Sequence, residues 1–245
     1  MNNRRSFITG LKSTKLSTLE KKFLKKYKPW GIILFTRNIK SIEQTSKLTT
    51  SIRKIFNDKR YPILIDQEGG RVNRLENIIS FDNLSSEFFG KLYIKNRKKF
   101  IFFYKLFINK TSHLLKSIGV NINTSPVLDL RIKGSSNIIG DRSFSSDPKI
   151  VSKIGDYSIQ YFHQNGIGSI IKHIPGHGLA KVDSHFFTPV INKDKEYLFK
   201  KDFIAFKNKK SFFAMTAHIV FNKIDQKNTV THSKKLIQLI RNKIG

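Results

Sequence analysis

The chain has 245 residues, of which 39% are hydrophobic and 12% aromatic, so it can bury a core and is not intrinsically disordered. The absence of cysteine excludes disulfides and thiolate metal sites, and no apolar run is long enough to predict a membrane span or a signal peptide. The net charge of +29 would suit a nucleic-acid binder, but the lysines are spread along the whole chain, which is typical of solvated surfaces.

Short segments rich in β-branched residues alternate with helical stretches. The predicted strands are 7–10, 31–35, 62–65, 120–123, 167–171 and 212–215. The predicted helices are 17–27, 42–56, 98–117, 148–165, 195–208 and 233–242, with Ser17, Ser41 and Ser233 as N-caps. This alternation predicts one parallel α/β domain over residues 1–245. Polar residues follow at least four of the strands, which favours a TIM-type (β/α) barrel over an open sheet.

The segment 171–185 combines two Lys, three His and one Asp with Pro and Gly, and it predicts a polar loop at a strand end. His173 and His177 are four positions apart, as in helical zinc sites, but Pro175 and Gly176 disfavour a helix there. Hydrogen bonding and proton transfer are the favoured interpretation, with the carboxylate of Asp183 orienting a histidine. We therefore expect neither a metal nor another cofactor.

Other polar groups follow earlier strands. Asp66 precedes Gly69 and Gly70, where the backbone can approach a ligand closely, and Arg142 lies in a turn-like segment, 139–144. Arg74 and Arg142 could each pair with a surface acid instead. Carboxylates, Arg, Lys and His without a phosphate-binding loop suit a neutral polyhydroxyl ligand such as a sugar.

Four motifs carry a resemblance to a known family: 64–75 (LIDQEGGRVNRL), 139–144 (IGDRSF), 172–178 (KHIPGHG) and 183–185 (DSH). They resemble, in the same order, motifs of the bacterial cytoplasmic β-N-acetylhexosaminidases of glycoside hydrolase family three. The segments 30–38 and 215–218 match the family pattern too. The resemblance implies a TIM-type barrel that removes non-reducing terminal β-N-acetylglucosamine by a retaining mechanism, chiefly from recycled muropeptides in the cytoplasm.

The resemblance also implies roles for particular residues. His185 would be the general acid/base, oriented by Asp183, and His177 and His218 would support the site. Substrate contacts would come from Asp66, Arg74, Arg142, Lys172 and His173.

The chain departs from the family at its C-terminal end. The family nucleophile is an Asp in a Ser/Thr-Asp-Asp motif that follows a segment resembling 237–245, and this chain contains no such motif. We therefore expect a barrel that lacks its last strands, a weakly stable chain, and little or no hydrolase activity from these 245 residues alone. The alternatives are a catalytically inactive sugar-binding protein and a basic nucleic-acid-binding protein. The expected partner is a small carbohydrate, with neither nucleic acid nor membrane.

Overall fold

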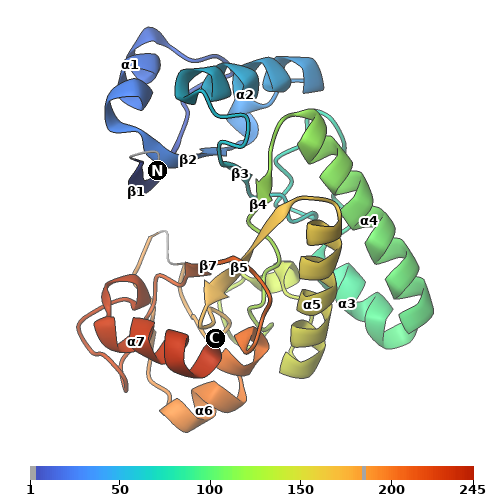
Figure 1. The fold of residues 1–245 in the computed structure, drawn as a ribbon. Coiled ribbons are helices and arrows are strands. Elements are labelled where there is room, and N and C mark those ends of the chain that lie inside the picture. Colours follow the sequence, from blue (N-terminus) through green and yellow to red (C-terminus); the bar gives the residue numbers. More distant parts are fainter. Residues whose placement is uncertain (1–3, 184–185) are drawn as a thin grey trace.

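The computed structural model describes residues 4–183 and 186–245. Its centre is a six-stranded sheet in the order β1-β2-β3-β4-β5-β7, in which every neighbouring pair is parallel (Figure 1). The strands are β1 (Arg5–Gly10), β2 (Pro29–Leu34), β3 (Ile63–Ile65), β4 (Ile122–Asn123), β5 (Gly168–Ile174) and β7 (Phe213–Thr216). A separate parallel pair joins β6 (Val190–Ile191) to β8 (Val220–Phe221). The order of the sheet is that of a TIM-type barrel, and β1 and β7 are its two ends, so the barrel is incomplete.

Helices follow most of the strands and cover the outside of the sheet. They are α1 (Thr18–Tyr27), α2 (Ile42–Phe56), α3 (Ser86–Lys95), α4 (Arg97–Ser117), α5 (Pro148–Gln164), α6 (Lys195–Lys200) and α7 (Lys234–Leu239). The 3₁₀ helices η1 (Thr36–Asn38), η2 (Gly140–Arg142), η3 (Phe203–Phe206) and η4 (Val230–His232) and a π-helical turn, η5 (Ile240–Ile244), complete the described part of the chain. None of the described helices has the length and apolarity that crossing a membrane requires.

All three predicted N-caps are confirmed. The hydroxyls of Ser17, Ser41 and Ser233 each accept a hydrogen bond from the backbone N–H three residues later. Glu20 also accepts from the backbone N–H of Ser17, which completes a capping box at the start of α1.

Three predicted elements need correction. The helix expected over 195–208 ends at Lys200, because the chain turns inward there and buries Asp202, Phe203 and Phe206. The helix expected over 233–242 changes to π-helical geometry after Leu239. The strand expected over 167–171 continues to Ile174, so its last residues belong to β5 and not to a loop.

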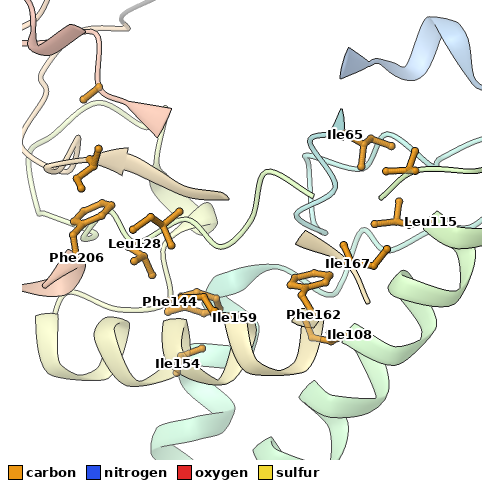
Figure 2. Close-up of a cluster of buried hydrophobic side chains, with 14 of the residues drawn as sticks. Ile65, Ile108, Leu115, Leu128, Phe144, Ile154, Ile159, Phe162, Ile167 and Phe206 are labelled. Carbon is orange, nitrogen blue, oxygen red and sulfur yellow. The ribbon is translucent and has the colours of Figure 1, made fainter. Parts of the chain in front are cut away.

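The main hydrophobic core lies between the sheet and the helices. Figure 2 shows side chains of α4 and α5 gathered with Ile65 of β3 in one cluster. Alternate strand residues point to opposite faces of a sheet. In β3, accordingly, Ile63 and Ile65 join this outer core, whereas Leu64 belongs to a second, smaller cluster.

The second cluster marks the inner face of the barrel. Leu64, Ile122 and Ile170 pack there with the partly buried Trp30 and Met215. A largely apolar hollow of about 620 Å³ adjoins them, lined by both end strands of the sheet, β1 and β7. In a closed barrel, layers of side chains from all the strands fill this space. The incomplete sheet therefore leaves part of its inner core open.

Gly90 shows how tightly the outer layer is packed. A Cβ atom added to Gly90 in α3 would lie 1.7 Å from the carbonyl oxygen of Phe144, and backbone cannot easily move away. At Gly155 in α5, an added Cβ would lie 2.5 Å from the end of the Leu128 side chain. That side chain, unlike backbone, can rotate away.

We therefore expect Gly90→Ala to lower the free energy of unfolding by about 3 kcal/mol. Gly155→Ala should lower it by less than about 1 kcal/mol, because the higher helix propensity of Ala offsets part of the clash. Urea unfolding of both variants measures the difference. Equal losses would show that α3 does not pack against the backbone of Phe144 in this way.

Candidate functional site

A cavity of about 460 Å³ opens where the parallel strands end. Active sites of TIM-type barrels lie at this C-terminal end of the strands. The cavity wall includes eight of the nine residues singled out in the sequence: Asp66, Arg74, Arg142, Lys172, His173, His177, Asp183 and His218. The ninth, His185, lies outside the residues that the structure describes.

Asp66 directly follows β3 and joins three strand ends. Its Oδ1 accepts a 2.9 Å hydrogen bond from the Nζ of Lys172 in β5, and a second one from the hydroxyl of Thr124, which follows β4. Burial alone would raise the pKa of Asp66, but the charge and hydrogen bond of Lys172, helped by Thr124, hold it below its usual value. Asp66 is thus an ionised carboxylate, and its side chain keeps 17% of its surface exposed.

Glu68 is the central anion of the site, although sequence reasoning gave it no role. Its Oε1 lies 2.5 Å from the Nζ of Lys172, and both of its oxygens accept from the guanidinium of Arg142, at 2.8 and 2.9 Å. Both Glu68 and Lys172 are only 2% exposed. Burial would raise the pKa of Glu68, but the two cations lower it far below its usual range. Its place in the motif 64–75, two positions after Asp66, was the available signal.

The loop after β3 owes its shape to local sequence. Gly69 and Gly70 adopt φ angles of +91° and +56°, and a Cβ on Gly69 would lie 2.5 Å from the carbonyl oxygen of Leu84. The side chain of Gln67 accepts hydrogen bonds from the backbone N–H groups of Arg74 and Leu75. These contacts fold the loop back on itself and bring Glu68 and Arg74 to the same cavity.

A second buried carboxylate, Asp129, holds the histidines. The Nδ1 of His173 lies 2.6 Å from Oδ2 of Asp129, and the backbone N–H of His177 donates to Oδ1 at 2.7 Å. Burial would raise the pKa of Asp129, but His173 and then His177 bring it below its usual value. With Nδ1 bound to Asp129, Nε2 of His173 remains for another partner. Sequence reasoning missed Asp129, whose one signal was a carboxylate inside the apolar run 127–130.

The remaining predicted residues lie around this centre. The rings of His173 and His177 are 5.6 Å apart, and burial lowers the pKa of His177, so His177 is neutral at pH 7. The guanidinium of Arg74 lies 5.8 Å from the ring centre of Phe35. Asp183 and His218 complete the wall. The arrangement offers hydrogen-bond acceptors and donors at fixed positions around one concave space.

Comparison with known proteins places these observations in a family. A β-hexosaminidase from Hydrogenovibrio crunogenus is 35% identical over 89% of this chain, and the match covers 61% of that protein. A β-hexosaminidase from Haemophilus influenzae is 31% identical, with coverages of 98% and 68%. The crystal structure of NagZ from Neisseria gonorrhoeae in complex with N-trifluoroacetyl-D-glucosamine superimposes with a TM-score of 0.90 at 28% identity, covering 99% of this chain and 72% of that one.

The chain thus spans about three fifths of the length of the Hydrogenovibrio relative. Residues 6–245, nearly the whole chain, match the family described as the glycosyl hydrolase family 3 N-terminal domain. Together with the incomplete barrel and the cavity at its strand ends, this match establishes that the chain belongs to the glycosyl hydrolase family 3 N-terminal domain family.

Proposed function

We propose that the chain is the sugar-binding part of a β-N-acetylhexosaminidase that removes non-reducing terminal β-N-acetylglucosamine. Its natural substrates would be muropeptides released during peptidoglycan recycling in the cytoplasm. In this proposal residues 1–245 form a single barrel domain without its last strands. The proposal is supported by the names of the relatives and by the cavity at the strand ends.

The observation that carries the proposal is the fixed charge array of the cavity. Asp66 and Glu68 supply two negative charges, and Lys172 and Arg142 supply two positive ones, all within one hydrogen-bonded network. The array has no net charge, so it suits a neutral polyhydroxyl ligand better than a phosphate or another anion. The partly exposed Asp66 can accept from sugar hydroxyls, while Arg142 and Arg74 donate to sugar oxygens.

The reaction would be retaining, with His185 as general acid/base and Asp183 as the group that orients it. A retaining glycosidase also needs a nucleophilic carboxylate about 5 Å from its acid/base. The sequence of this chain contains no Ser-Asp-Asp or Thr-Asp-Asp motif to supply the family nucleophile. We therefore propose that the 245 residues bind the sugar without turning it over.

Calorimetric titration with N-acetylglucosamine tests this function. We expect saturable binding, and Asp66→Ala should weaken it about tenfold or more, a loss of at least about 1.4 kcal/mol of binding free energy. Asp156→Ala is the matched control, because Asp156 on α5 forms an ion pair with Lys209 and does not line the cavity.

The same preparation is expected to release no aglycone from a chromogenic β-N-acetylglucosaminide. Equal binding by the wild-type chain and Asp66→Ala would contradict the proposed site. Binding to single-stranded nucleic acid that weakens steeply with salt and is unaffected by Asp66→Ala would favour the nucleic-acid alternative.

A further inference from the structure

Asp202 is a buried carboxyl group that lies outside the cavity wall. It lies between α6 and η3 and is 1% exposed. Both of its carboxyl oxygens are buried without a hydrogen-bond partner among residues 4–183 and 186–245. A charged group in such surroundings is strongly destabilising, and a neutral one is far less so. The position of Asp202 therefore requires an explanation.

The side chain of Asp202 packs against the turn 175–178, which carries His177. A Cβ atom added to Gly176 would lie 2.5 Å from the Cβ of Asp202. A Cβ added to Gly178 would lie 3.1 Å from Oδ1 of Asp202 and 2.5 Å from the carbonyl oxygen of Leu130. The turn 175–178 thus packs against Asp202: the Asp202 side chain leaves room only for glycine at position 176, and the carbonyl of Leu130 does so at position 178. The side chain of Asp202 and this turn are therefore in direct contact.

The charge state of Asp202 follows from its neighbours. Burial, and then the negative charge of Asp129, raise the pKa of Asp202 to about 8. The titratable group that acts on Asp202 is Asp129, from the segment after β4, and His173 and His177 act in turn on Asp129. Lys201, its neighbour in sequence, is exposed. At neutral pH one of the two buried carboxyls, Asp129, is therefore charged while Asp202 holds a proton.

We propose that Asp202 is a positioning residue for the sugar site. Its side chain holds the turn 175–178 in place, and through this turn His173 and His177, only while its carboxyl group is uncharged. When Asp202 ionises, a second buried negative charge faces Asp129 beneath the turn. The repulsion between the two carboxylates and the hydration of the new charge displace the turn 175–178 from the side chain of Asp202. The part of this inference that concerns sugar binding rests on the proposed function, whereas the protonation of Asp202 does not.

Protonation has a direct consequence for stability. The folded chain keeps the proton of Asp202 up to about pH 8, whereas the unfolded chain releases it near pH 4. Between these values the unfolded state binds fewer protons, so this residue makes the folded state less stable as pH rises. The effect changes the unfolding equilibrium constant about tenfold per pH unit and levels off above pH 8. The amide of the Asp202→Asn variant has no proton that titrates in this range, so the variant lacks this pH dependence.

The experiment compares the wild-type chain with Asp202→Asn and with the control Asp156→Asn. Urea unfolding is followed at pH 5, 6, 7, 8 and 9, and N-acetylglucosamine affinity is measured at pH 6.5 and 9. We expect the stability of Asp202→Asn relative to the wild type to rise with pH up to about 8 and then stay constant. The wild type should bind the sugar at least about fivefold more weakly at pH 9, whereas Asp202→Asn should bind equally at both pH values. Asp156→Asn should follow the wild type throughout.

Each outcome decides the proposal. The proposal would be overturned if the stability of Asp202→Asn and that of the wild type changed with pH in the same way. It would also be overturned if the pH dependence of stability disappeared in Asp202→Asn but its affinity for the sugar still fell between pH 6.5 and 9. If Asp202→Asn does not fold, infrared spectroscopy of the wild-type chain answers the question, because a buried protonated carboxyl gives a C=O band that must disappear between pH 6.5 and 9.5; absence of this band would refute the proposal. If no variant binds the sugar at any pH, the proposed function and the positioning role both fail, while the stability profile still tells whether Asp202 is protonated.

Discussion

Replacing Lys172 with methionine is expected to lower the free energy of unfolding by about 3–5 kcal/mol. Lys172 is only 2% exposed, and its Nζ lies 2.5 Å from Glu68 and 2.9 Å from Asp66. Methionine retains most of the volume but removes the charge. Glu68 then keeps Arg142 as its one cation among the described residues, and Asp66 keeps only the hydroxyl of Thr124. Urea unfolding at pH 7 measures the loss.

Lys200→Met provides the control for this prediction. Lys200 also contacts a carboxylate, that of Glu196 at 2.6 Å, but both side chains are more than 70% exposed. A solvent-exposed pair four residues apart in a helix contributes less than about 0.5 kcal/mol. If Lys172→Met were no more destabilising than Lys200→Met, the buried charge network would not exist as described.

Asp129→Ala is expected to have an effect of similar size on stability, about 3 kcal/mol or more. Asp129 is completely buried and accepts from the imidazole of His173 and from the backbone N–H groups of His173 and His177. Alanine leaves these donors without their acceptor. Because His173 also loses its orientation, the affinity for N-acetylglucosamine should fall about tenfold or more. Urea unfolding and calorimetry measure the two effects separately.

A double-mutant cycle shows whether Asp129 acts on the sugar through His173. If it does, Asp129→Ala should weaken binding little further once His173→Ala is present, because the group that it orients has gone. Fully additive losses would mean that Asp129 affects the ligand by another route. The unfolding measurements show whether both variants remain folded at the temperature of the titration.

Much of the fold could be predicted because it depends on local signals. Ser17, Ser41 and Ser233 mark helix starts by their side-chain chemistry alone, and β-branched runs mark the strands. Helix α3 was not predicted, since Gly90 interrupts its pattern and its place is set by the close approach to Phe144. The break after Lys200 was missed because tertiary burial of Asp202 and its neighbours overrides helical periodicity.

The site shows the same division between local and distant determinants. Motifs rich in Asp, Arg and His pointed to most of the cavity wall. The roles of Glu68 and Asp129 were missed, although each had a weak local signal, because their partners are remote in sequence: Asp129 is 44 positions from His173, and Glu68 is 74 from Arg142. Only the parallel sheet brings these groups together.

The most direct test of the account is a crystal structure of this chain with N-acetylglucosamine. We predict density for one sugar in the cavity at the strand ends, in contact with Asp66 and with at least one of Arg74, Arg142 and His173. Density for the sugar elsewhere on the molecule, or an empty cavity in crystals grown at a concentration that saturates the chain in solution, would contradict the account.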